Sequence, residues 1–307
     1  MRNSFANAFY EIAKKDERIY LVVADITAAA GVASFQKESP ERFLNVGVAE
    51  QIMIGMAAGL ALRGMIPFTY TIAPFTIYRP FEQVRVDCCY QNLPVKLVGV
   101  GAGVTYSTLG GTHHAFEDVA ILSALPNMTI YAPCDPAEAA ATTYATVETP
   151  GPVYLRLGKV GEPDLTKDAE PFVAGKIRRL KDGKDGVIFT YGPIAKMALD
   201  VAAKVAEAKG ISLAVYGVPT LKPLDRSGIA VVLARYRQAY VVEEHVPHGG
   251  LSSWVKEIVV DEGINSRVKS FTLKDEFIHS YGSHGDLLAA HGLSIETITQ
   301  GILPWHS

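Results

Sequence analysis

The chain has 307 residues, of which 49% are hydrophobic and 20% are charged, and its formal net charge is −3. This composition is that of an ordinary globular protein, and the length suggests two domains, each large enough for its own core. Because there is no basic block, and the longest apolar runs are too short or too interrupted to span a bilayer, we expect neither nucleic acid nor a membrane as a partner.

The first half of the chain alternates between helical and strand-like patterns. We expect helices at 3–15, 49–63, 81–92, 116–124 and 136–146, and strands at 18–24, 43–48, 66–71, 94–100, 129–132 and 153–156. Continuous apolar strands between helices are typical of a parallel sheet that is covered on both faces. Residues 1–160 are therefore predicted to form one doubly wound α/β domain.

A stretch rich in Gly, Pro, Lys and Asp begins at Gly158, and we assign 161–184 to a linker. A second, smaller α/β domain is predicted over 185–307. Its expected strands are 186–191, 211–216, 239–243 and 268–272, and its expected helices are 194–209, 228–235, 250–262, one around Leu287, and 295–303. The predicted fold class is thus α/β, with two doubly wound domains and mostly parallel sheets.

The cysteines give a prediction about the compartment. The three of them, Cys88, Cys89 and Cys134, are odd in number and lack metal-ligand spacing. Both properties fit buried thiols in a reducing environment. The N-terminal residues have the pattern of an amphipathic helix rather than of a signal peptide. We therefore expect a cytoplasmic protein.

The stretch from Arg42 to Gly64 is the most informative part of the chain. A short apolar strand stops before Glu50, and a helix that is apolar on nearly every side begins there. Such a helix is expected to be buried in protein. Glu50 then lies in the crevice at the carboxyl end of a strand, where open α/β sheets bind ligands. The alternative is a structural carboxylate that faces the positive end of the helix dipole.

A second candidate is the glycine-rich loop from Gly101 to Asp118, which carries His113 and His114 just before a predicted helix. Glycines let a backbone approach a ligand closely, and imidazoles exchange protons near neutral pH. The alternative is a loop that caps the helix, with one histidine facing solvent. A metal site made by both histidines and Asp118 is disfavoured, because adjacent residues of a helix point apart.

The turn Gly47-Val-Ala-Glu50-Gln51 resembles the strand-to-helix turn of thiamine-diphosphate enzymes of the transketolase group, and Thr112-His113-His114 resembles a later segment of the same family. The resemblance implies that Glu50 hydrogen-bonds a ring nitrogen of the cofactor's aminopyrimidine. It also implies that His113 approaches the substrate and the reactive carbon, so that both residues are catalytic. A flanking substrate role is implied for His114.

The implied role of Glu50 requires a carboxyl group that holds a proton near neutral pH. An unperturbed glutamate titrates near pH ~4.3 and is almost wholly ionised at neutrality. Raising its pKa by roughly 2–3 units takes about 3–4 kcal/mol of desolvation, so the site has to be dry. We expect a subunit interface to provide this dryness.

Further residues gain roles from the resemblance. The family stacks an aromatic ring on the aminopyrimidine, for which Phe75 is the first choice and Tyr78 the second; the alternative is that all three aromatics of this segment, Phe81 included, belong to the core. Asp25 matches an aspartate near the cofactor. Arg79 matches a substrate-facing arginine of the related deoxyxylulose-phosphate synthases, where a guanidinium can fork onto an oxyanion. Lys159 falls at the position of a phosphate-binding arginine. The lysine keeps the positive charge but lacks the forked hydrogen-bonding geometry of a guanidinium.

The chain resembles only the C-terminal half of a full-length transketolase. Residues 1–160 match the pyrimidine-binding domain, and 185–307 match the C-terminal domain. The other half holds the cofactor's diphosphate through a divalent metal, with a Gly-Asp-Gly motif and a later Asn. The nearest string here, Gly285-Asp-Leu287, lacks the final glycine. Because a diphosphate without a cationic grip is poorly held, the resemblance implies a partner subunit that carries Mg²⁺ (or Ca²⁺ or Mn²⁺) in an α2β2-type assembly.

Three positions depart from the family pattern around the substrate. Leu109 stands where an aspartate reads a sugar hydroxyl, and Gly101 and Ala29 stand where a histidine and a serine help to bind a sugar phosphate. We therefore expect a transketolase-like transfer of a two-carbon ketol unit from a ketose to an aldehyde-type acceptor, with a non-standard sugar. A branched, sulfonated, deoxy or carrier-bound sugar would fit these departures.

Two other functions stay open. One is the beta subunit of a 2-oxoacid dehydrogenase, or of a two-carbon-adding enzyme of sugar biosynthesis; the acceptor, a lipoyl domain or a sugar aldehyde, distinguishes these. The other is a non-catalytic paralogue that only binds a partner. In the second domain, the segment from Val241 to His245 and the glycines at 249–250 resemble a structural or interface turn of the family, and we assign them no catalysis.

Overall fold

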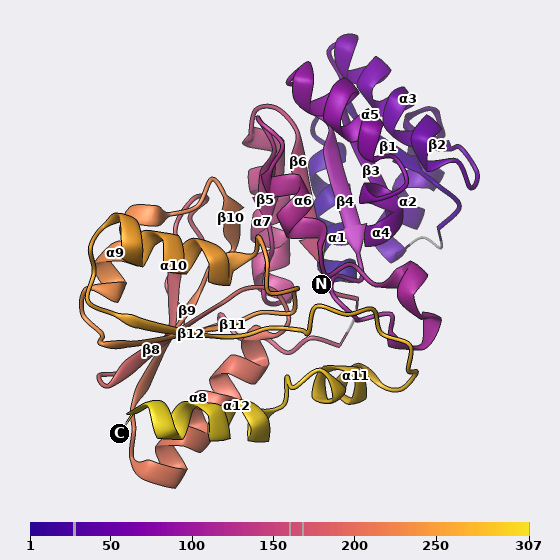
Figure 1. Ribbon diagram of the computed structural model, residues 1–307. Helices are drawn as coiled ribbons and strands as arrows, with labels where there is room; N and C mark the ends of the chain where they lie inside the picture. The colour runs from indigo at the N-terminus through magenta and orange to yellow at the C-terminus, as the bar shows by residue number, and fades with distance from the viewer. Residues whose placement is uncertain (27–28, 160, 168, 307) are drawn as a thin grey trace.

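Two sheets, one in each half of the chain, organise the protein (Figure 1). The computed structural model describes residues 1–26, 29–159, 161–167 and 169–306. Among these residues the first sheet has seven strands in the order β10-β5-β6-β4-β3-β1-β2. They are β1 (Ile19–Val23), β2 (Phe43–Asn45), β3 (Ile66–Ile72), β4 (Lys96–Val100), β5 (Thr129–Tyr131), β6 (Val153–Leu157) and β10 (Thr220–Lys222). All neighbours are parallel except β10, which runs antiparallel to β5.

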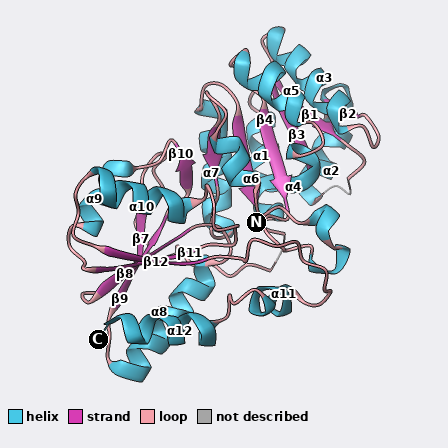
Figure 2. Cartoon of the chain, viewed as in Figure 1, coloured by secondary structure: helices cyan, strands magenta, loops and turns pink. Residues whose placement is uncertain are grey.

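Helices cover both faces of this sheet (Figure 2). They are α1 (Arg2–Ala13), α2 (Ala30–Glu38), α3 (Glu50–Leu62), α4 (Ala73–Ile77), α5 (Phe81–Gln83), the π-helix Val84–Tyr90, α6 (Asp118–Ser123) and α7 (Pro136–Glu148). Phe5, Phe9 and Phe35 belong to a core cluster on the side of α1, α2 and α7. Met53 and Val119 belong to a second cluster on the side of α3 and α6. The predicted doubly wound domain is therefore confirmed.

The second sheet has five strands among the described residues, in the order β12-β11-β8-β9-β7. They are β7 (Arg178–Lys181), β8 (Gly186–Thr190), β9 (Leu213–Gly217), β11 (Gln238–Val242) and β12 (Arg267–Phe271). Its helices are α8 (Ala195–Lys209), α9 (Arg226–Leu233), α10 (Leu251–Asp261), α11 (His284–Ala290) and α12 (Ile295–Ile302). In Figure 1, α9 and α10 lie on one side of the sheet and α8 and α12 on the other. Only β7 is antiparallel to its neighbour.

The helix α3 is buried on one face and open on the other. Met53, Ile54 and Ala57 pack in the core, whereas Ile52 is 58% exposed and Leu62 is also exposed. The expectation that the whole helix is buried is therefore wrong for the single chain, because the sheet covers only one side of it. An apolar helix face left open in this way is typical of an interaction surface.

Several short elements differ from the expectation. The strand expected at 43–48 is the short β2, which is half-buried at most because it has a neighbour on one side only. The helix expected at 81–92 begins as α5 and continues as the π-helix Val84–Tyr90. The helices α2 and α4 and the strand β10 were not predicted. The three cysteines are free and buried, as expected, and none of the helices among the described residues has the length and apolar character of a membrane span.

The range expected as a linker, 161–184, is anchored to the first domain. Asp135 caps α7 through Oδ1, which accepts from the Glu138 backbone N–H at 2.7 Å. Its Oδ2 accepts from the backbone N–H groups of Leu165 and Thr166 at 2.8 and 2.7 Å. One buried carboxylate therefore fixes both the start of a helix and the chain that leaves the first domain.

The end of the same range is a strand rather than a linker. Residues Arg178–Lys181 form β7, which pairs with β9. The Arg178 guanidinium also donates to Glu138 Oε1 at 2.8 Å, in a buried ion pair with α7. The linker expectation is thus wrong for these residues, because edge pairing and an ion pair hold a basic segment that has no apolar strand pattern.

We expect Asp135→Ala to lower the free energy of unfolding by about 2–3 kcal/mol, because it removes a helix cap and leaves buried N–H groups unpaired. Urea denaturation measures this change. Asp200→Ala is the control, since Asp200 only pairs with Lys196 on the surface of α8, and its effect should stay below ~0.5 kcal/mol. Equal effects of the two substitutions would refute the anchoring role.

Candidate functional site

A cavity of about 220 Å³ lies where the chain leaves β1 and β3 and where α3 and α4 begin. Its lining residues are Ala24, Asp25, Ile26, Val48, Glu50, Thr71, Ile72, Phe75, Arg79 and His113. The carboxyl ends of parallel strands meet at one edge of a sheet, so residues far apart in sequence converge here. Of the residues predicted for the site, the structure brings together Asp25, Glu50, Phe75, Arg79 and His113.

Glu50 is the first residue of α3, and it is only 3% exposed. The Arg79 guanidinium donates through Nη1 to Glu50 Oε1 at 2.7 Å. The same guanidinium lies over the ring of Phe75, with its carbon 3.8 Å from the ring centroid. The Arg79 side chain is 42% exposed, and this one cation covers both the buried carboxylate of Glu50 and the half-buried ring of Phe75.

His113 forms the opposite wall of the cavity. Its ring meets that of Phe75 edge to face, with the centroids 5.0 Å apart, and its Nδ1 lies 2.9 Å from Thr112 Oγ1. Burial and, secondarily, the positive charge of Arg79 lower the pKa of His113 below its ordinary value. The imidazole is therefore neutral at neutral pH and can accept a proton from a substrate.

Asn45 joins the two strand ends that supply Asp25 and Glu50, and it was not among the residues predicted for the site. Its side-chain oxygen accepts from the backbone N–H groups of Asp25 at 3.1 Å and Gly47 at 3.0 Å. Asp25 has a φ of +45°, a conformation that is uncommon for a residue other than glycine. The signal available in the sequence was an amide side chain within the predicted strand 43–48.

Tyr78 and Lys159 do not reach the cavity. The Tyr78 hydroxyl donates to Glu117 Oε2 at 2.7 Å, and burial raises its pKa. Lys159 lies with Nζ 4.7 Å from the centroid of the Tyr106 ring, and that ring is 6.1 Å from the ring of His113. Tyr106, which was not predicted, therefore stands between the lysine and the site.

His114 is buried rather than turned to the cavity. Burial lowers its pKa, and its ring nitrogens have no hydrogen-bond partner among the described residues. Among the described residues, no three His, Cys, Asp or Glu side chains lie close enough together to hold a metal ion.

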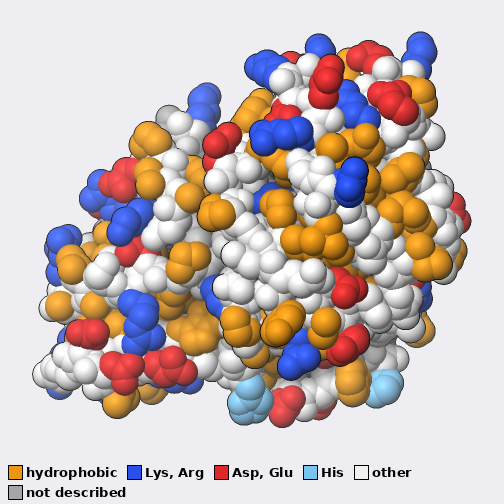
Figure 3. All heavy atoms as spheres, turned by 90° about the horizontal axis from the view of Figure 1, so that it is seen from above, with side chains coloured by type: hydrophobic (Ala, Val, Ile, Leu, Met, Phe, Trp, Pro, Cys, Tyr) orange, Lys and Arg blue, Asp and Glu red, His pale blue; other side chains and the backbone are white. Residues whose placement is uncertain are grey.

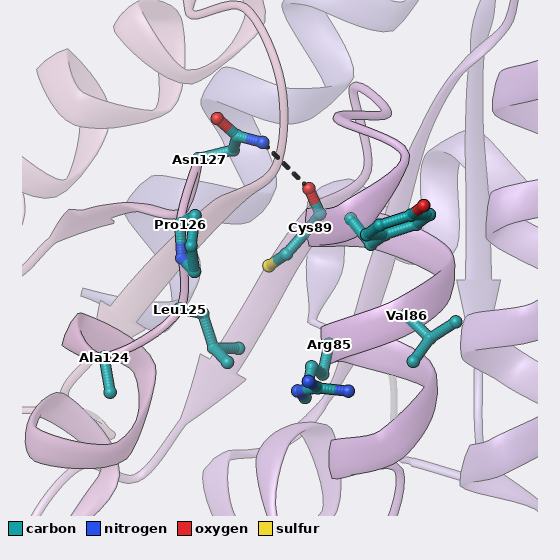
Figure 4. A pocket seen from close by; sticks show the side chains of 8 residues that line it. Arg85, Val86, Cys89, Ala124, Leu125, Pro126 and Asn127 are labelled. Carbon is teal, nitrogen blue, oxygen red and sulfur yellow. Dashed lines mark hydrogen bonds between the residues drawn. The ribbon is translucent and has the colours of Figure 1, made fainter.

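A second cavity, of about 540 Å³, lies between the π-helix and the segment 124–127 (Figure 4). At the rim of this cavity, the side-chain amide of Asn127 donates to the carbonyl oxygen of Cys89 at 3.0 Å. Its lining is mostly apolar and includes none of the predicted site residues. In contrast to this cavity, the smaller one brings together a carboxylate, a guanidinium and an imidazole.

Two sequence families match the chain. The family described as "Transketolase, pyrimidine binding domain" matches residues 1–160, and "Transketolase, C-terminal domain" matches residues 175–298.

Three relatives match this chain over most of their own length. The chain is 35% identical to one of the subunits of the apulose-4-phosphate transketolase of Actinobacillus succinogenes, over 97% of this chain and 96% of that protein. It is 36% identical to "6-deoxy-6-sulfo-D-fructose transketolase subunit SqwH" of Clostridium sp., over 84% of this chain and 80% of that one. A solved structure, "Split gene transketolase, inactive beta4 tetramer", has 34% identity and a TM-score of 0.87, with 99% of this chain and 96% of that chain covered.

We expect Arg79→Gln to raise the pKa of His113, because it removes a positive charge that opposes protonation of the imidazole. An NMR titration of the histidine ring signals measures the pKa. Arg85→Gln, which removes an arginine that lines the second cavity instead, serves as the control. An unchanged pKa in Arg79→Gln would show that the guanidinium does not act on His113.

Proposed function

The chain belongs to the transketolase family as a transferase subunit, the C-terminal section of a split transketolase-like enzyme, and on this premise we propose that its Glu50 cavity takes the pyrimidine half of thiamine diphosphate. The reaction moves a two-carbon ketol unit from a ketose to an aldehyde-type acceptor. One observation carries the proposal: a buried carboxylate begins a helix at the carboxyl ends of the strands, beside an aromatic ring and a neutral histidine.

The donor set of the cavity fits a planar ring that contains nitrogen. Glu50 offers a buried carboxyl group as a hydrogen-bond partner, and Phe75 offers an aromatic face. In the single chain the Arg79 guanidinium lies over that face and pairs with that carboxylate. A ring can take this place only after Arg79 turns away, and the exposure of its side chain leaves room for that movement.

Each wall of the cavity has a defined task in this reaction. When bound, thiamine diphosphate supplies the carbon nucleophile that accepts the two-carbon unit. Glu50 holds a proton against the ring nitrogen, which exclusion of water favours. His113 exchanges a proton with a substrate oxygen, because its neutral imidazole can accept one near neutral pH. Arg79, once released from Glu50, pairs with an anionic group of the substrate.

The partner subunit is proposed to hold the diphosphate and its Mg²⁺ and to cover the open face of α3. Ile52 and Met56 support this, since they lie four residues apart on α3 and are both exposed, and Val48, just before the helix, is exposed too. Figure 3, which shows the molecule from the side of α3 and α5, has hydrophobic side chains gathered in patches there. Covering this face excludes water from Glu50, as the proton-holding role requires.

An α2β2-type assembly is proposed for the active enzyme, and the cytoplasm for its location. The solved relative is an inactive tetramer of beta chains. By analogy, this subunit associates with itself when alone and needs its partner for turnover. Free, buried thiols support a reducing compartment.

A non-standard sugar is proposed as the substrate, and Tyr106 supports it. A side chain at Gly101 would put its Cβ 2.0 Å from the Tyr106 ring, so that ring fills the space where other family members carry a substrate-binding histidine. Leu109, which replaces a hydroxyl-reading aspartate, is half-exposed in the same loop. Relatives named for apulose 4-phosphate and for a sulfonated fructose support a branched or sulfonated sugar.

In the reconstituted pair of subunits, Glu50→Gln should lower kcat about 10²-fold or more, because the amide cannot hold or release the proton. Steady-state turnover of a ketose donor measures it. Glu82→Gln, which changes a carboxylate outside the cavity on the nearby α5, should leave kcat unchanged. Full activity of the Glu50 variant would favour a subunit that only binds its partner.

Ile52→Asp should weaken association with the partner subunit at least about tenfold, because it places a charge in an apolar contact. Analytical ultracentrifugation of the mixed subunits measures the dissociation constant. Val260→Asp is a matched control, since Val260 is 78% exposed on α10 in the second domain. A partner that binds both variants equally well would place the interface elsewhere.

A further inference from the structure

The loop that carries His113 is closed at its base by the backbone. Gly103 N–H donates to the Ala115 carbonyl oxygen and Ala115 N–H donates to that of Gly103, both at 2.8 Å. Residues 104–114, which include His113, form the loop that these two hydrogen bonds close. The position of His113 against Phe75 therefore depends on what holds the base of the loop.

A carboxylate from the second domain holds it. Glu244, which follows β11, is buried, and its Oε1 accepts from the Val104 backbone N–H at 2.6 Å. The carboxylate also fills the space beside Gly103, where an added Cβ would lie 2.2 Å from Oε1. Gly103 has a φ of +63°, a conformation that glycine adopts readily. Because it has no side chain, it also lets Glu244 approach closely.

Two further contacts fix Glu244 in place. His284 Nε2, at the start of α11, lies 2.9 Å from Glu244 Oε1, and the charge of Glu244 raises the pKa of His284. The Arg156 guanidinium donates through Nη2 to the carbonyl oxygens of Ala115 and Glu244, at 3.1 and 3.3 Å. Figure 1 shows the chain after β12 running back toward the first domain to reach α11.

We propose that Glu244 is a positioning residue for the transfer reaction: it fixes the base of the loop 103–115 and thereby keeps His113 at the cavity. The second domain then contributes to catalysis without lining the cavity itself. This inference rests on the proposed function for its catalytic consequence, whereas its structural part, the fixing of the loop, stands independently of the reaction.

The neighbouring Glu243 provides a matched control. It is also buried, and its carboxylate accepts from the backbone N–H groups of Leu251 and Ser252, both at 2.9 Å, at the start of α10. Both of these partners lie within the second domain. Both Glu243→Ala and Glu244→Ala remove a buried carboxylate. Glu243→Ala also removes the acceptor for two N–H groups at the start of a helix, but it leaves the loop attached.

The test compares Glu244→Ala, Glu244→Gln and Glu243→Ala in the reconstituted pair. We expect Glu244→Ala to lower kcat at least about tenfold, since small displacements of a catalytic group are costly. Glu244→Gln should keep most of the activity, because its amide oxygen still accepts from Val104. Glu243→Ala should keep the kcat of its folded fraction. Amide hydrogen exchange over 103–115 should accelerate in Glu244→Ala and not in Glu243→Ala.

The outcomes separate the two claims. Unchanged exchange over 103–115 in Glu244→Ala would overturn the positioning role, whatever the activity. An equal loss of kcat in Glu243→Ala would also overturn it, because the effect would then be a general one of domain stability. If the unsubstituted pair transfers no ketol unit, the proposed function fails instead, and the exchange result still decides whether Glu244 fixes the loop.

Discussion

The structure depends on one constraint: the carboxylate of Glu50 is buried at the start of a helix that has an apolar, open face. In the single chain, the charge of Glu50 is met by the half-exposed Arg79, which also lies over the ring of Phe75. The Glu50 carboxylate and the Phe75 ring therefore both have a partner within the single chain. A second polypeptide on the open face of α3 would exclude water from Glu50, and a planar ring on Phe75 would displace Arg79. The same cavity thus has one arrangement in the single chain and another in the assembly that we propose.

The second domain is joined to this site through buried charge. Arg156 and Asp118 form an ion pair with an N···O distance of 2.8 Å inside the first domain, and Arg156 continues to the backbone of Glu244 in the second. Breaking a buried pair of this kind leaves an uncompensated charge, which is strongly destabilising. Asp135 performs a similar task for the connecting segment. The two domains are therefore fixed to each other at the loop that carries His113, which a flexible linker by itself would not achieve.

Much of the site could be predicted because parallel strands place their carboxyl ends at one edge. Asp25, Glu50 and Phe75 each follow a strand, and the structure brings them to one cavity. The choice between Phe75 and Tyr78 could not be settled from spacing, because it depends on the direction of the short α4. The burial of His114 could not be predicted from the sequence either, because it depends on how the two domains pack against each other. Strand β7 was not predicted, because its residues are mostly basic and show no apolar pattern. It is a strand because it pairs with β9.

Binding of thiamine diphosphate decides whether the site is divided between two subunits. Thiamine diphosphate with Mg²⁺ is titrated calorimetrically into this chain, into the partner subunit proposed to hold the diphosphate, and into their mixture. We expect tight binding only in the mixture, because each subunit supplies one half of the site and the contact between them excludes water from Glu50. Binding of the same affinity by this chain by itself would contradict this expectation.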